Sequence, residues 1–160
     1  MNGLVACVRE QLDERCLVGK GTLRKEACEV YLTGMPGSRV VADLDKPGAP
    51  LGEHETRCDF LLFAEEHGNE GWKEWVVPLE LKARLELRRV AAQLQAGADA
   101  ADRLVADASE VAFVPVVACH LKKGQRRRLK ESLMRVTFKN RKPETFRLMR
   151  CGGNLIDHIR

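Results

Sequence analysis

Residues 57–83, RCDFLLFAEEHGNEGWKEWVVPLELKA, contain the stretch that decides the fold. Residues 58–64 and 75–83 are apolar segments of strand length, and a polar stretch separates them. We predict two antiparallel strands, with residues 65–74 as a long connection between them. Because proline cannot donate to a β-ladder, Pro78 is expected at a sheet edge or a bulge.

Both segments carry charged residues where a buried strand would normally be apolar. Asp59 opens the first segment, and Glu80 and Lys82 interrupt the second. Side chains two positions apart on a strand share a face, so Glu80 and Lys82 point the same way and Leu81 points oppositely. If the strands pair antiparallel, Asp59 reaches that same end of the sheet.

The rest of the chain alternates between helical and extended patterns. Helices are predicted over residues 3–17, 86–107 and 124–134, and further strands over 28–33, 39–45, 111–118, 135–139 and 145–150. The segment 111–118 is apolar without alternation, which is typical of a strand covered on both faces. The order predicts an α/β (α+β) fold in which helices flank a mixed central β-sheet, with residues 1–160 forming one domain.

Charge is divided unevenly along the chain. Residues 1–119 hold 14 Lys and Arg against 20 Asp and Glu, whereas residues 120–160 hold 13 against 3. An acidic front with a basic tail fits a carboxylate site beside a phosphate-binding surface, and a solvated basic helix is the alternative. The predicted nucleic-acid-binding residues are Lys122, Lys123, Arg126, Arg127, Arg128 and Lys130.

The six cysteines form no C-x-x-C pair, and most lie in apolar runs. We therefore expect buried free thiols in a reducing cytoplasm, and the absence of paired spacing disfavours a zinc site built from Cys28, Cys58, Cys119 and Cys151. No run of eighteen apolar residues occurs, and the N-terminus lacks a basic leader. The expectation is a cytoplasmic protein that does not enter a membrane.

The charged residues in the two strands have a chemical use. Two carboxylates, Asp59 and Glu80, together with the main-chain carbonyl of Leu81, can hold a hard divalent cation such as Mg²⁺ or Mn²⁺. Such an ion offsets charge on a phosphodiester in its transition state. Lys82 would then orient the attacking water or stabilise the developing negative charge.

Asp59 followed by Glu80-Leu81-Lys82 resembles the motif of the PD-(D/E)XK nuclease superfamily. The resemblance covers residues 3 to about 118, and it implies neighbouring strands of a mixed sheet, Mg²⁺ or Mn²⁺ as cofactor, and a nucleic acid, with DNA favoured, as substrate. It departs from the family pattern because Cys58 stands where proline is usual. A homodimer is also expected, because small nucleases of this kind often dimerise.

The resemblance also implies auxiliary residues on two helices. Gln93, at the border of the apolar stripe of the predicted helix over 86–107, resembles the polar residue that many members place near the site, and Gln95 is the weaker candidate. Many members also place a glutamate on the first helix. We favour Glu10 for that role, with Glu14 and Glu29 as alternatives.

Four interpretations of the three main residues follow. We favour a metal-dependent endonuclease acting on DNA, in phage defence or repair by analogy. The others are a ribonuclease using the same site, an inactive nuclease fold that binds nucleic acid or a partner, and a purely structural arrangement. In the last, Glu80 and Lys82 form a solvated edge pair and Asp59 caps a strand.

Overall fold

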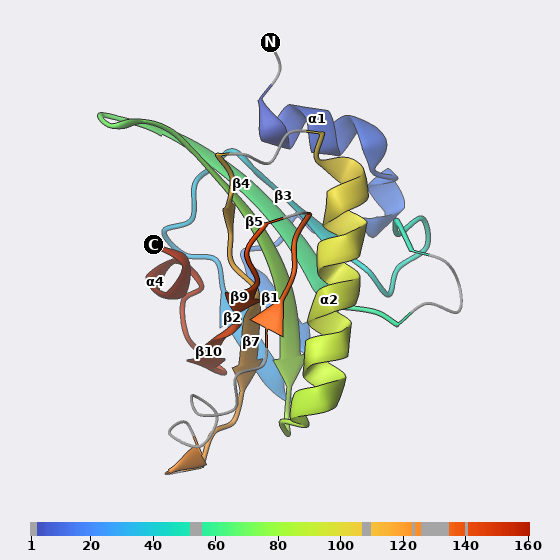
Figure 1. Ribbon diagram of the computed structural model, residues 1–160, viewed down its shortest axis with the longest axis vertical. Coiled ribbons are helices and arrows are strands. Elements are labelled where there is room, and N and C mark those ends of the chain that lie inside the picture. The colour runs from blue at the N-terminus through green and yellow to red at the C-terminus, as the bar shows by residue number, and fades with distance from the viewer. Residues whose placement is uncertain (1–2, 52–55, 107–109, 123, 126–134, 140) are drawn as a thin grey trace.

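The computed structural model describes residues 3–51, 56–106, 110–122, 124–125, 135–139 and 141–160, drawn in colour in Figure 1. Its helices are α1 (Leu4–Gln11), the short 3-10 helix η1 (Glu14–Cys16), α2 (Leu87–Leu104) and α4 (Ile156–Ile159). Its strands are β1 (Thr22–Lys25), β2 (Cys28–Tyr31), β3 (Arg39–Asp43), β4 (Phe60–Gly68), β5 (Gly71–Lys82), β6 (Ala112–Phe113), β7 (Val116–Cys119), β8 (Arg135–Val136), β9 (Glu144–Thr145) and β10 (Arg147–Arg150). The predicted basic helix over 124–134 falls almost entirely outside the described residues.

A mixed six-stranded sheet forms the centre of the molecule. The strand order is β10-β7-β5-β4-β3, with β6 also paired to β5. β3, β4 and β5 pair antiparallel, whereas β7 pairs parallel to β5 and β10 pairs parallel to β7. The end of β3, the start of β4 and the ends of β5 and β7 therefore meet at one edge of the sheet, which is the lower end in Figure 1.

Both faces of the sheet are covered. α1 and α2 pack on one face, against a cluster that includes Leu61, Phe63 and Val76. The β1–β2 hairpin and α4 cover the other face, where Leu79 and Leu81 are buried. Covering on both sides explains why the segments in β4, β5 and β7 are apolar without alternation. The prediction of a mixed sheet flanked by helices is confirmed.

The connection between the two central strands is shorter than the sequence suggested. Gly68 pairs with Gly71, so β4 and β5 continue through the polar stretch and only Asn69 and Glu70 form the turn. The prediction of a long connection over 65–74 is wrong, because these polar residues lie in a projecting hairpin arm where both faces can meet water (Figure 1).

Pro78 lies in the interior strand β5 and pairs with Leu61 in an unbroken register, so it is at neither an edge nor a bulge, contrary to the prediction. β5 pairs with β6 at Trp75 and Val76, and it pairs with β7 from Leu79 onward. Pro78 falls in the interruption between the two pairings, so its missing N–H removes no ladder bond there.

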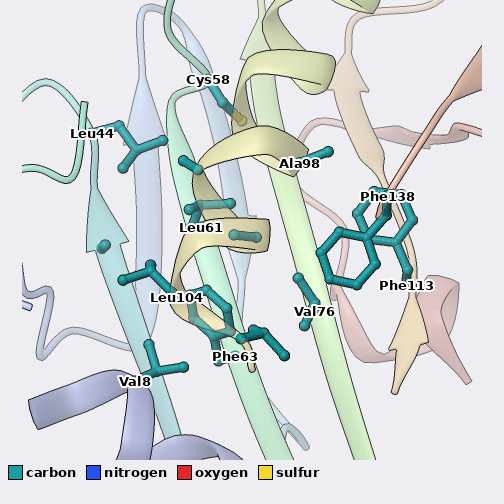
Figure 2. Packing of buried hydrophobic residues seen from close by; sticks show 14 of the residues in the cluster. Val8, Leu44, Cys58, Leu61, Phe63, Val76, Ala98, Leu104, Phe113 and Phe138 are labelled. Atoms are coloured by element: carbon teal, nitrogen blue, oxygen red, sulfur yellow. The ribbon is translucent and has the colours of Figure 1, made fainter. Parts of the chain in front are cut away.

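α2 lies very close to the sheet at Gly97. A Cβ atom at this position would lie 2.9 Å from Cβ of Cys58 and 3.0 Å from Cβ of Pro78. Figure 2 shows Cys58 and Leu61 beneath this part of the helix. The glycine thus permits a close approach that a larger residue would prevent, and it fixes the height of α2 above the start of β4 and the end of β5.

The expectation of free thiols throughout is wrong for two cysteines. Cys28 and Cys151 form a disulfide although 123 positions separate them, whereas Cys16, Cys58 and Cys119 are buried thiols. Parallel pairing of β7 with β10 and packing of β2 across them bring Cys28 and Cys151 together. That tertiary proximity leaves no trace in cysteine spacing.

Candidate functional site

Asp59 and Glu80 face each other at the edge where the strand ends meet. Phe60 pairs with Leu79 in the antiparallel ladder, so Asp59 and Glu80 are the next opposed residues. The main-chain N–H of Asp59 donates to Oε1 of Glu80 at 2.7 Å, and the N–H of Leu81 donates to Oδ2 of Asp59 at 2.9 Å. Each carboxylate is thus fixed by the backbone of the other strand.

These two bonds leave one oxygen of Glu80 without a hydrogen bond. Its Oε2 is buried and has no hydrogen-bond partner within the described part of the chain. The Lys82 ammonium lies 3.3 Å from this oxygen, within ion-pair distance but without hydrogen-bond geometry, and the side chains are 0% (Glu80) and 16% (Lys82) exposed. The interpretation of Glu80 and Lys82 as a solvated edge pair is wrong, because β5 is an interior strand.

Burial dominates the electrostatics of this pair. Desolvation raises the pKa of Glu80 to about 8, the nearby Asp59 charge adds to the effect, and Lys82 opposes it. Burial also raises the pKa of Asp59, whereas the hydrogen bond from the Leu81 N–H and the charge of Lys82 lower it. The two carboxylates are therefore close enough to interact, and an additional positive charge between them would favour both ionised forms.

Replacing Glu80 with glutamine should stabilise the metal-free protein in alkaline solution. Between its ordinary pKa of 4.5 and the folded value of about 8, Glu80 keeps a proton that the unfolded chain has lost. The free energy of unfolding therefore falls as pH rises through this window, and Glu80→Gln removes that contribution to the slope. Urea denaturation in EDTA should give the variant an advantage of roughly 3 kcal/mol at pH 9 relative to pH 5.

Glu70→Gln, at the exposed hairpin turn, is the matched control and should show no such pH dependence, since that carboxylate is 85% exposed. Equal stability differences for Glu80→Gln at both pH values would contradict the assignment of a protonated, buried carboxyl to this position.

Gln93 lies on α2, one helical turn before Gly97. Residues four apart share a helix face, so Gln93 lies above the sheet on the side nearer the N-terminus of α2. Gly97 abuts Pro78, and Glu80 is two residues further along β5 on the same face. Oε1 of Gln93 is buried and lacks a hydrogen-bond partner among the described residues. Gln95 differs, because its amide bonds both the N–H and the carbonyl of Thr137.

The structure does not bring Glu10 to this edge. Glu10 is exposed on α1, and its neighbour Gln11 donates to the carbonyl of Leu104 at the far end of α2. The site lies by the N-terminus of the same 18-residue helix, which is about 27 Å long. The choice of Glu10 is therefore wrong. Of the alternatives, Glu14 lies in η1, and Glu29 accepts from the hydroxyl of Tyr31.

Another pair of carboxylates beside the site shares one cation, Lys25. The ammonium of Lys25 is 2.9 Å from Oδ1 of Asp43 and 3.1 Å from Oδ2 of Asp45. Asp43 ends β3 next to the start of β4, and the N–H of Leu44 donates to the carbonyl of Asp59. Lys25 could not be assigned from the sequence, because its short strand β1 is mostly polar.

The donor set suits a hard cation. The inward oxygen of Glu80 lacks a hydrogen bond, Asp59 is fixed opposite it, and the amide oxygen of Gln93 is a further unpartnered acceptor. Oxygen ligands of this kind are those that Mg²⁺ and Mn²⁺ prefer. Over the described ranges, no group of three or more His, Cys, Asp or Glu side chains could hold a metal ion, so any ion here relies on two carboxylates and neutral oxygens.

The basic surface is described only in small part. Lys122 is exposed next to the end of β7, and its N–H donates to the side chain of Gln125. The other predicted phosphate-binding residues, Lys123, Arg126, Arg127, Arg128 and Lys130, lie outside the described residues.

A cavity that was not predicted from the sequence adjoins the site. It has a volume of about 300 Å³, and Lys82 belongs to its wall. The other lining residues are Glu26, Ala83, Arg84, Glu86, Arg89 and Val90. The cluster of arginines after the E-x-K tripeptide was the available signal.

Comparison of the chain with models of protein families, with curated proteins and with solved structures gives no match in any of the three. None of the helices in the described part of the chain is long and apolar enough to cross a membrane.

Proposed function

We propose that this protein is a metal-dependent nuclease that hydrolyses phosphodiester bonds, with DNA as the favoured substrate. The observation that carries the proposal is the pair of carboxylates cross-bonded at the strand ends, with Oε2 of Glu80 buried and without a hydrogen bond. The Lys82 ammonium lies 3.3 Å from this oxygen but leaves it without a hydrogen bond, and such a buried acceptor is costly unless a ligand satisfies it. A divalent cation is the ligand that fits both carboxylates.

The residues have separate tasks in the proposed reaction. Asp59, Glu80 and the Leu81 carbonyl would hold Mg²⁺ or Mn²⁺, which when bound would offset the negative charge of the phosphate and acidify a water. Lys82 would donate hydrogen bonds from its ammonium to the attacking water or to a phosphate oxygen. Gln93 would orient a water molecule or a substrate oxygen through its unpartnered Oε1.

The topology supports the same proposal. Three antiparallel strands, a helix and two short strands parallel to the third follow one another as β3, β4, β5, α2, β6 and β7. This is the arrangement that the resemblance to the PD-(D/E)XK superfamily implies, with the motif residues at the start of one strand and the end of its neighbour. A restriction-endonuclease-like fold is part of this proposal.

The test separates metal binding from cleavage. Calorimetric titration of the full chain with Mn²⁺ should show binding, and plasmid DNA should be cut in Mg²⁺ or Mn²⁺ but not in EDTA. An RNA hairpin offered in parallel should be cut more slowly. The absence of metal binding would refute the proposal, as would binding of metal without cleavage of DNA or RNA.

The rival function is a catalytically inactive nuclease fold that binds nucleic acid or a protein partner. The specific observation in its favour is the Cys58-Asp59 dipeptide where the superfamily has proline and aspartate. Cys58 is buried, however, and its thiol contacts the carbonyls of Phe60 and Leu79 at 3.3 Å and 3.2 Å, so it fills a structural position. Asp59 keeps its place beside Glu80, which favours the active enzyme.

A further inference from the structure

We infer that the cavity lined by Lys82, Arg84 and Arg89 is a binding site for a backbone phosphate of the nucleic acid, next to the phosphate that is cleaved. This inference rests on the proposed function, because it places a second contact of the same substrate. The site is separate from the Asp59 and Glu80 carboxylates, and Lys82 is the residue that belongs to both.

The charges in the cavity favour an anion. Three cationic side chains line it against two carboxylates, those of Glu26 and Glu86. Glu26 is already engaged, since its Oε2 accepts from the N–H of Ala83 at 3.2 Å. This bond holds the carboxylate against the wall of the cavity without removing its charge, so the cationic side chains outnumber the carboxylates by one.

The two arginines are available for a ligand. Both side chains are exposed, and two acidic residues line the same cavity. Even so, neither guanidinium has a carboxylate or carbonyl partner among the described residues. A guanidinium presents several N–H donors in a planar fork that matches two oxygens of a phosphate. Two such groups in one cavity therefore suit a phosphodiester better than an uncharged, apolar ligand.

The start of α2 contributes to the same cavity. Glu86 is the N-cap residue, and its side chain accepts no hydrogen bond from the first turn of the helix. The N–H groups of that turn are therefore not bonded to the N-cap side chain. Helix N-termini carry partial positive charge and open N–H donors, which add to the attraction for phosphate. The volume of about 300 Å³ leaves room for a phosphate with part of its sugar.

The experiment uses the full chain with a fluorescent DNA duplex in Ca²⁺, and also in EDTA, so that binding is measured without turnover. Arg84→Ala/Arg89→Ala should weaken binding at least tenfold. It should also reduce the slope of log Kd against log salt concentration by the amount expected for the loss of about one to two phosphate contacts. Arg88→Ala, which alters an exposed arginine outside the cavity, is the matched control and should change Kd less than threefold.

Two further arms make the assignment specific. Glu86→Gln removes a competing negative charge and should tighten binding, which is the opposite of the effect expected for Arg84→Ala/Arg89→Ala. Methylphosphonate substitution at single positions should identify one phosphate whose neutralisation weakens binding to wild type but not to Arg84→Ala/Arg89→Ala. An effect of Arg88→Ala as large as that of the double variant would overturn the inference, as would weaker binding by Glu86→Gln.

Failure of this inference is distinguishable from failure of the proposed function. If wild type binds DNA with arginine-dependent affinity but cuts nothing in Mg²⁺, the phosphate site stands and the nuclease proposal falls. If wild type cuts DNA and the double variant binds as tightly as wild type, the phosphate site falls and the nuclease proposal stands.

Discussion

Replacing Lys82 with methionine should reduce the rate of DNA cleavage about a thousandfold while metal binding is retained. The ammonium lies 3.3 Å from Oε2 of Glu80 on an almost buried side chain, so it is held beside the proposed metal position without being a ligand. Methionine preserves the length and packing of the stem and removes only the charge and its donors. The rate should be measured in single turnover, with Mn²⁺ affinity determined by calorimetry on the same preparation.

Asp59→Asn and Lys73→Met are the matched comparisons. Asparagine at 59 keeps an acceptor for the Leu81 N–H but loses a metal-binding charge, so both Mn²⁺ binding and cleavage should fall. Lys73 lies on the exposed hairpin arm and should affect neither. Cleavage by Lys82→Met within tenfold of wild type would contradict its assigned role, as would loss of metal binding together with activity.

The central part of the site could be predicted because it lies on local patterns. Charged residues inside apolar segments marked Asp59, Glu80 and Lys82, and antiparallel pairing was enough to place them together. Gln93 was implied by the resemblance to the PD-(D/E)XK superfamily, and its place at the border of the apolar stripe only selected it over Gln95. The placement of Asp59, Glu80 and Lys82 needed only the period of a strand and the pairing of neighbouring segments.

Other features depend on packing between distant segments. Helical periodicity placed Glu10 on a helix but did not indicate at which end of the sheet that helix lies. The strand β1 has one buried residue, Leu23, so its pattern gave no reason to expect that Lys25 would reach Asp43 and Asp45. Glu26, in the β1–β2 turn with a φ of 52°, likewise meets Ala83 only through tertiary packing.

The Cys28–Cys151 disulfide should contribute the largest single covalent term to stability. A bond that closes a loop of 123 residues restricts the unfolded chain strongly, by about 5 kcal/mol in the chain-entropy account. Urea denaturation of the full chain should therefore give a free energy of unfolding lower by about 2–5 kcal/mol when dithiothreitol is present.

Cys28→Ser/Cys151→Ser provides the matched control. This variant should match the reduced wild type in stability and should not respond to dithiothreitol. A change of less than about 1 kcal/mol on reduction of wild type, or an equal response of the variant, would contradict the prediction.

Reduction should also weaken the proposed active site, because the bond lies directly beneath it. Sγ of Cys151 is 3.9 Å from the carbonyl oxygen of Lys82, and Sγ of Cys28 is 3.6 Å from that of Ala118. Cys28 also directly follows the β1–β2 turn whose Glu26 bonds to Ala83, while Lys25 of the same hairpin holds Asp43 and Asp45. The disulfide therefore holds the β1–β2 hairpin, whose Lys25 pairs with the carboxylates beside Asp59, against the central strands. Cleavage should consequently fall at temperatures where the reduced protein is still folded.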